Sequence, residues 1–264
     1  MLSKKEIICP ENLLKIAKTK GPVKVVIVNA GKSIAIESAK KSVNEGLIEP
    51  IFIGDKLIIE KLAKDIQWNI SRYEIINEPI ENNTALIAAK LASEEKVKII
   101  VKGHIHTDIL MKAVLKRDLN LIGKKRLSHV WHMTLEKNDK PFIITDGALN
   151  VLPKLETKMH ILKNSVDFAK RIGINRPKVS VLSATEEVLE SVPSSIDAKE
   201  LTTRAQNEVK DADIFGPMAF DNSVSEKAAQ IKGIKNIVAG KTDILLVPNV
   251  ETGNSLVKMM IYFM

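Results

Sequence analysis

The segment Lys102–Asp108, with the sequence KGHIHTD, holds the densest group of side chains that could do chemistry. His104 and His106 alternate at the end of an apolar run of strand length. Two imidazoles on one face of a strand can ligate a divalent metal ion, and metal-dependent amidohydrolases place such a pair on an early barrel strand. Those enzymes also need histidines and an aspartate from later strands. The chain has five histidines and none after His160, so metal-dependent hydrolysis is the less favoured interpretation.

The same segment fits an interpretation that needs no metal. A nest of backbone amides at Gly103, with Thr107 and Asp108 capping the helix that follows, accounts for the same residues. We therefore expect no metal ion at this site.

A cationic segment, Gly123–Val130 with the sequence GKKRLSHV, precedes a predicted hairpin. Cations at the mouth of a cleft suit a phosphorylated ligand. Arg126 is the one whose planar guanidinium could hold an oxyanion through two hydrogen bonds. We expect Lys124 and Lys125 to be solvated.

The sequence AGKS at Ala30–Ser33 follows an apolar run and opens a predicted helix, as a phosphate-binding P-loop would. That motif also needs a glycine five residues before Gly31, where this chain has Val26. Because Val26 lies inside the predicted strand, no glycine-rich loop can surround a triphosphate. We expect Ser33 to act as a simple N-cap of the helix.

Apolar runs alternate with segments of helical spacing through the first half of the chain, which predicts a mostly parallel sheet covered on both faces. The expected strands are Val23–Val28, Ile51–Gly54, Tyr73–Asn77 and Val97–Val101, and the expected helices are Ser33–Asn44, Leu57–Ile66, Asn83–Ser93 and Thr107–Leu115.

The pattern changes after Gly123. Leu127–Leu135 and Pro141–Thr145 indicate two strands joined by the polar turn EKNDK, which is typical of a hairpin. The alternation then resumes, with helices Leu155–Ile172, Ala198–Val209 and Ser225–Ile231 and strands Lys178–Leu182, Ile214–Phe215 and Ile244–Val247. We therefore predict two α/β lobes, residues 1–126 and 127–250, with parallel-rich sheets and an inter-lobe cleft at the carboxyl ends of the strands.

Composition narrows the class of protein. The chain has 264 residues, of which 45% are hydrophobic, and this is enough for one large or two modest cores. The formal charge of +8 comes mainly from lysines on predicted helical faces, and only 4% of the residues are aromatic, so no platform for stacking bases is visible. A single cysteine, Cys9, excludes a disulfide framework. We expect a cytoplasmic protein without nucleic-acid or membrane partners, and a polyanionic small molecule remains compatible with the charge.

Five segments together resemble the phosphate acetyltransferase and phosphate butyryltransferase family, in particular its version associated with enoyl-CoA hydratases. The resemblance covers nearly the whole chain, and the order and spacing of the five segments make it specific. The segments are KGHIHTDILM (Lys102–Met111), RLSHVWHM (Arg126–Met133), PFIITDGALN (Pro141–Asn150), DIFGPMAFDNSVS (Asp213–Ser225) and DILLVPNVETGN (Asp243–Asn254).

The resemblance implies reversible transfer of an acyl group between coenzyme A and inorganic phosphate. The segments FIITDGALN and HIHTD look most like those of the acetyltransferases, which favours acetyl over butyryl. The resemblance also implies an architecture like that of isocitrate and isopropylmalate dehydrogenases, a homodimer or higher homo-oligomer, and no cofactor besides coenzyme A as substrate. Arg126 would hold the phosphate as the catalytic cation. The substrate-binding residues would be Gly103, Thr107, Asp108, Ser128, Gly216, Asp221, Asn222, Gly253 and Asn254.

The last segment, residues 251–264, is expected to be a helix that returns the chain to the first lobe. It ends on Ile261–Met264 without a capping glycine or asparagine. Members of the family continue into a strand with a Ser-Arg-x-Asp motif that this chain lacks, so we expect a C-terminally truncated enzyme. The alternative is an inactive remnant that binds coenzyme A.

Overall fold

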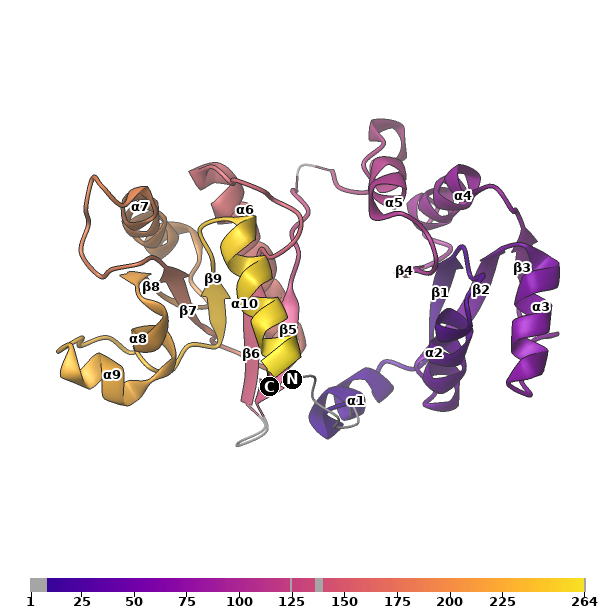
Figure 1. The fold of residues 1–264 in the computed structure, drawn as a ribbon, viewed down its shortest axis with the longest axis horizontal. Helices are drawn as coiled ribbons and strands as arrows, with labels where there is room; N and C mark the ends of the chain where they lie inside the picture. Colours follow the sequence, from indigo (N-terminus) through magenta and orange to yellow (C-terminus); the bar gives the residue numbers. More distant parts are fainter. Residues whose placement is uncertain (1–8, 124, 136–139, 264) are drawn as a thin grey trace. The chain divides into compact units, whose positions relative to one another are not determined.

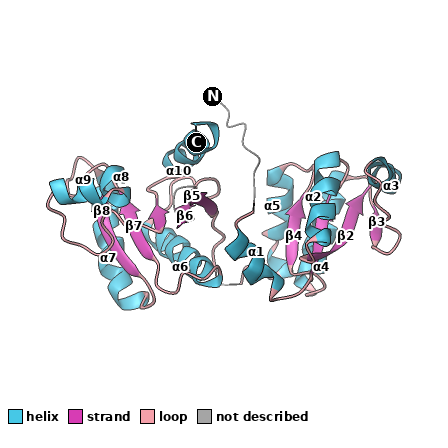
Figure 2. Cartoon of the chain, turned by 90° about the horizontal axis from the view of Figure 1, so that it is seen from below, coloured by secondary structure: helices cyan, strands magenta, loops and turns pink. Residues whose placement is uncertain are grey.

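The computed structural model describes residues 9–123, 125–135 and 140–263, which fold into two compact units (Figure 1). We refer to Glu11–Lys124 as the N-terminal unit and to the chain from Lys125 onward as the C-terminal unit. Each unit is built on its own sheet, with helices around the strands (Figure 2).

The N-terminal unit contains a parallel sheet in the order β3-β2-β1-β4. Its strands are β1 (Val23–Val28), β2 (Ile48–Gly54), β3 (Ile75–Asn77) and β4 (Ile99–Lys102), and its helices are α1 (Glu11–Lys18), α2 (Ser33–Asn44), α3 (Lys56–Asp65), α4 (Glu81–Ser93), α5 (Thr107–Val114) and the 3-10 turn η1 (Arg117–Leu119). Alternate residues of β1 face opposite sides of the sheet. Val25 and Ile27 pack in a cluster with α2 and α3, and Val26 packs in a second cluster with α4 and α5.

The C-terminal unit contains a five-stranded sheet in the order β5-β6-β9-β7-β8. Its strands are β5 (Trp131–Leu135), β6 (Lys140–Thr145), β7 (Lys178–Leu182), β8 (Asp213–Met218) and β9 (Ile244–Leu246), and its helices are α6 (Leu155–Arg171), α7 (Pro193–Glu208), α8 (Phe220–Val224), α9 (Glu226–Ile231) and α10 (Val250–Phe263). The helices α6 and α7 cover one face, and Val257 of α10 packs with Ile144 of β6 in a separate cluster.

The alternation of strands and helices predicted from the sequence is confirmed, and so is the hairpin, because β5 pairs antiparallel with β6. The other paired strands of the C-terminal sheet are parallel. The helices α1 and α8 were not predicted, and α7 begins at Pro193, five residues before the predicted start at Ala198. Proline favours the first turn of a helix because its missing N–H has no partner there.

The prediction that Ser33 caps α2 is wrong. The N-cap is Lys32, whose backbone is extended and whose side chain makes no capping hydrogen bond. Ser33 is already inside the helix, so its hydroxyl lies one position too late to cap it.

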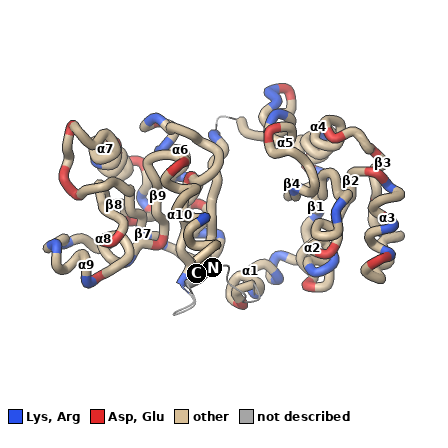
Figure 3. Tube along the Cα trace, viewed as in Figure 1, with Lys and Arg blue, Asp and Glu red and all other residues tan. Residues whose placement is uncertain are grey.

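Lysine and arginine are interspersed with aspartate and glutamate along both units (Figure 3). This distribution fits a solvated basic surface better than a basic stripe for nucleic acid. Within the described residues, no helix combines the length and apolar character that a bilayer crossing requires.

Candidate functional site

Asp146, directly after β6, organises the carboxyl end of the C-terminal sheet. Its side chain is 2% exposed. One carboxylate oxygen, Oδ1, accepts from the backbone N–H groups of Ala148 (3.0 Å) and Leu149 (2.8 Å). The other, Oδ2, accepts from the backbone N–H of His129 (3.0 Å) and from the Asn150 Nδ2 (2.7 Å). Four donors therefore hold this carboxylate and tie the turn after β6 to the segment before β5.

The segment that carries Arg126 and Ser128 is held from helix α6. The Nδ2 of Asn164 donates to the carbonyl oxygen of Arg126 (2.8 Å) and to the Ser128 Oγ (3.0 Å). The Arg126 side chain is exposed, and it makes no hydrogen bond or ion pair with the residues that the structure describes. Its guanidinium thus keeps its donors available for an anion. Lys124 lies outside the described residues.

Gly253 and Asn254 fasten the start of α10 to the turn after β6. A Cβ atom on Gly253 would lie 2.8 Å from the Gly147 Cα and 2.9 Å from the Asp146 carbonyl oxygen. The Nδ2 of Asn254 donates to the carbonyl oxygen of Gly147 (3.1 Å). Both residues therefore have packing roles, and a role in substrate binding stays a prediction.

Gly216 is buried inside β8, and Asn222 is buried in helix α8, which follows that strand. A Cβ on Gly216 would lie 2.7 Å from the Val181 Cβ, so the neighbouring strand leaves no room for a side chain. Asn222 is fully buried in α8. Asp221, by contrast, is exposed on the same helix. The structure brings Asn222 but not Asp221 into the interior of this turn.

Glu186 fixes the turn between β8 and α8, and sequence reasoning gave it no role. Its Oε1 accepts from the Ala219 backbone N–H (2.9 Å) and from the Asn222 Nδ2 (2.7 Å). Burial raises the pKa of the Glu186 carboxyl, but these two hydrogen bonds together with nearby Lys232 outweigh burial, so that its pKa lies below its usual range. The carboxylate is therefore ionised at neutral pH and keeps the turn fixed.

In the N-terminal unit, the predicted amide nest at Gly103 is wrong. The N–H of Gly103 donates to the Val28 carbonyl oxygen (2.9 Å), and the N–H of His104 donates to the Asn29 carbonyl oxygen (2.9 Å). Because both groups are used within the unit, neither can donate to an anion. A Cβ on Gly103 would lie 2.4 Å from the Val28 oxygen, so this glycine allows a close backbone approach.

Thr107 and Asp108 do not cap α5, contrary to the prediction. The N-cap is His106, and Thr107 is the first helical residue. Asp108 is exposed and pairs with Lys112 (3.2 Å), whose hydrogen bond lowers the pKa of the Asp108 carboxyl. Binding roles for Thr107 and Asp108 stay predictions.

The two histidines of this segment are not gathered into a metal site. The His106 Nδ1 lies 2.8 Å from the Glu81 Oε1, which also accepts from the His106 backbone N–H (2.6 Å). Among the residues that the structure covers, no group of three His, Cys, Asp or Glu side chains could hold a metal ion.

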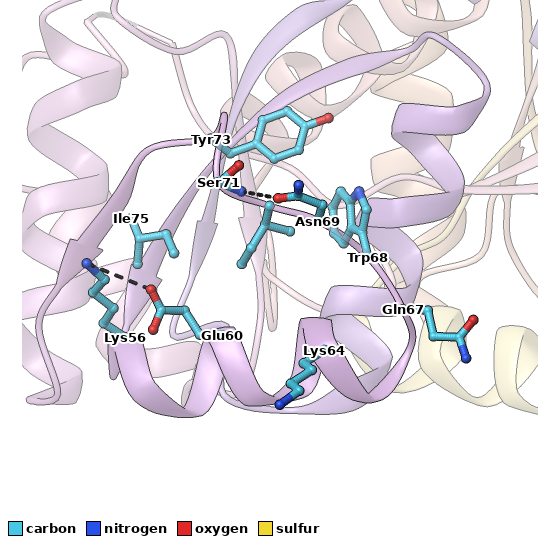
Figure 4. A pocket seen from close by; sticks show the side chains of 10 residues that line it. Lys56, Glu60, Lys64, Gln67, Trp68, Asn69, Ser71, Tyr73 and Ile75 are labelled. Carbon is cyan, nitrogen blue, oxygen red and sulfur yellow. Dashed lines mark hydrogen bonds and ion pairs between the residues drawn. The ribbon is translucent and has the colours of Figure 1, made fainter.

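A cavity of about 790 Å³ lies beside β3 and α3 (Figure 4). Lys56 and Glu60 form an ion pair at its rim (3.8 Å), and Asn69 accepts from the Ser71 backbone N–H (3.0 Å). None of the predicted site residues lines it. We therefore do not place the chemistry there.

Comparison with known proteins decides the family. The family model described as "Phosphate acetyl/butaryl transferase" matches residues 73–263. The chain belongs to this family.

Named relatives agree with this assignment. The chain is 38% identical to a phosphate acetyltransferase of Rickettsia prowazekii over 253 residues, which cover 95% of this chain and 72% of that protein. It is 36% identical to a phosphate butyryltransferase of Clostridium acetobutylicum, with 96% and 84% covered. The crystal structure of a branched-chain phosphotransacylase from Enterococcus faecalis superposes with a TM-score of 0.79 at 30% identity, covering 90% of this chain and 83% of that one.

The resemblance inferred from the five segments is thus confirmed, as is an α/β fold with parallel-rich sheets. The likeness to isocitrate and isopropylmalate dehydrogenases stays a prediction. Sequence reasoning gave no role to Asn164 or to Asp146. In this family member Asn164 fixes the segment around Arg126, and Asp146 fixes the turn after β6.

Two half-buried histidines predict a pH dependence of stability in this family member. The His129 Nδ1 and the His132 Nε2 are buried without a hydrogen-bond partner in the described part of the chain. Burial lowers the pKa of both imidazoles, and the charge of Asp146 only partly offsets this for His129. The unfolded chain therefore takes up protons first as the pH falls below about 6.5.

We expect the thermal midpoint to be constant above that pH and to fall as the pH drops towards the lowered pKa values of the folded state. Replacing His132 by Phe should make this decline shallower, because the unfolded state then gains one proton fewer. Calorimetry between pH 7.5 and 5.5 measures the slope, and His104→Gln is the control because His104 is exposed. An equally steep decline in His132→Phe would contradict the assignment.

Proposed function

We propose that the protein is a phosphate acyltransferase that moves a short acyl group, acetyl by preference, between coenzyme A and inorganic phosphate. In the direction of acyl phosphate formation, a phosphate oxygen attacks the thioester carbonyl, the carbon–sulfur bond breaks, and coenzyme A leaves with the proton that phosphate gives up. The observation that carries the proposal is the family match over residues 73–263, supported by relatives named as phosphate acetyl- and butyryltransferases.

Arg126 is proposed as the cation that holds the phosphate. Its backbone is fixed through Asn164, while its exposed guanidinium has no partner among the described residues. A planar guanidinium can donate two parallel hydrogen bonds to a phosphate, and it spreads the charge that develops in the transition state. Ser128 would contribute to the same phosphate site as Arg126. Its Oγ lies 3.0 Å from the Asn164 Nδ2, although the two residues are 36 positions apart in the sequence.

Coenzyme A enters as a substrate, and we propose that neither a metal ion nor another cofactor takes part. We further propose a cytoplasmic protein that forms a homodimer or higher homo-oligomer and has no nucleic-acid or membrane partner. Light scattering of the purified protein tests the oligomeric state, and a monomer would contradict it.

Phosphate-dependent release of thiol from acetyl-CoA tests the function. Replacing Arg126 by Ala should lower the turnover by about 10²–10³-fold, which is the usual cost of losing one group that stabilises transition-state charge. Replacing Arg126 by Lys should retain only part of the wild-type turnover, because an ammonium is a point charge without the planar fork. Arg171→Ala is the matched control, since Arg171 is also exposed and lies at the end of α6.

Wild-type protein that binds coenzyme A but releases no thiol would contradict the proposed activity. Equal losses in Arg126→Ala and Arg171→Ala would contradict the role of Arg126. The ratio of kcat/KM for acetyl-CoA to that for butyryl-CoA decides the acyl preference.

A further inference from the structure

A cavity of about 690 Å³ lies at the carboxyl ends of β7, β8 and β9, where α7 and α10 begin. Leu182, Phe220 and Leu256 supply apolar walls, and Asn249 and Lys158 are among its polar groups. Small-molecule sites combine apolar walls with a few fixed polar groups in this way.

An ion pair between two helices forms part of the cavity lining. The Nζ of Lys158 on α6 lies 2.6 Å from the Asp197 Oδ2 on α7. The Lys158 side chain is only 5% exposed, whereas that of Asp197 is 42% exposed. An ammonium has three N–H donors, and in the described part of the chain Lys158 uses its ammonium only towards Asp197. Burying a charged donor is costly unless its hydrogen bonds are made.

Lys158 and Asp197 thus present a donor and an acceptor side by side in a cavity whose other polar lining residues, Ser183, Ser194, Asn249 and Thr252, are uncharged. A secondary amide has the complementary pair, a carbonyl oxygen that accepts and an N–H that donates. A chain of secondary amides separated by apolar carbons would match both the pair and the walls. A free phosphate would match less well, because Asp197 would repel it.

We propose that this cavity binds the pantetheine arm of coenzyme A, with Lys158 donating to an amide carbonyl and Asp197 accepting from an amide N–H. The inference rests on the proposed function, since coenzyme A is the proposed substrate, and it assigns the arm to residues of the C-terminal unit. Lys158 and Asp197 act here in binding and have no part in the chemical step.

The test compares coenzyme A with adenosine 3′,5′-bisphosphate, which lacks the pantetheine arm. Calorimetry gives Kd for both ligands. The Kd of the bisphosphate divided by the Kd of coenzyme A, called here the arm ratio, measures the affinity that the arm adds. In Lys158→Met this ratio should fall about tenfold, which corresponds to one lost hydrogen bond to a charged donor. Asp197→Asn should also lower it, because the new amide places a donor where the acceptor stood.

Lys163→Met is the matched control. Lys163 lies on the same helix and pairs with Glu208 (2.7 Å), and it does not line this cavity. The arm ratio of Lys163→Met should equal that of the wild type. Circular dichroism checks the fold of each variant. Asp197→Asn changes a half-exposed residue and leaves the buried Lys158 in place, so it tests the proposal if Lys158→Met does not fold.

An unchanged ratio in folded Asp197→Asn would overturn the proposal, as would equal losses of affinity for coenzyme A and for the bisphosphate. A lower ratio in Asp197→Asn supports it whether or not the wild type turns over. The absence of thiol release therefore counts against the proposed function alone.

Discussion

Replacing Asp146 by Asn is expected to lower the free energy of unfolding of the C-terminal unit by about 3–5 kcal/mol. The substitution keeps the size of the side chain but turns one acceptor oxygen into an NH2 group. Whichever way the amide is oriented, that NH2 faces two of the four donors that now bind the carboxylate. At 2% exposure, water cannot replace the lost acceptor.

Trp131 offers a probe for this experiment, because it packs in the C-terminal unit. The other of the two tryptophans, Trp68, lies in the N-terminal unit and can be replaced by Phe to isolate the signal. Urea unfolding then compares Asp146→Asn with Asp167→Asn, a control on the exposed side of α6. A loss below about 1 kcal/mol would show that Asp146 does not organise the turn.

Local pattern was sufficient to predict most of the fold. The run VKVVIV of β1 is apolar on both faces, and four of its six residues are buried in the sheet as expected. The polar turn EKNDK between two apolar runs predicted the hairpin of β5 and β6. In both cases the signal is local, because the apolar residues that become buried follow one another within the element itself.

The two missed helices are short. Helix α1 carries Leu13, Leu14 and Ile16 at helical spacing, but it has only eight residues and buries none of them, and so short a pattern does not by itself mark a helix. Helix α8 has five residues and is held by its contacts: Asn222 donates to Glu186, which lies 36 positions earlier. A partner at that separation cannot be recognised from local spacing.

The candidate site shows the same division. Arg126 was found because an arginine before a hairpin has a chemical argument of its own. Its support by Asn164, and the pair formed by Lys158 and Asp197, join residues that lie 38 and 39 positions apart. The prediction of an amide nest failed for a related reason. The residues around Gly103 do not show that its backbone N–H donates to the carbonyl oxygen of Val28 in β1, 75 positions earlier.

Replacing Gly103 by Ala is expected to lower the free energy of unfolding of the N-terminal unit by about 2–3 kcal/mol. The new Cβ would lie 2.4 Å from the Val28 carbonyl oxygen and 2.7 Å from the Asn29 carbonyl oxygen, and neither backbone atom can move without disturbing the end of β1. Urea unfolding followed through Trp68, with Trp131 replaced by Phe, measures the effect in this unit alone.

Gly31→Ala in the same unit is the matched control, because the nearest atoms to its new Cβ are 4.0 Å away. It should leave stability unchanged or raise it by up to about 1 kcal/mol through a less flexible unfolded chain. The comparison separates the two roles considered for Gly103. A packing role predicts lost stability in Gly103→Ala, whereas a binding role predicts weaker affinity for coenzyme A in a protein of unchanged stability. The 2.4 Å approach to β1 favours the first outcome, since a neighbouring carbonyl fills the space that a ligand would need.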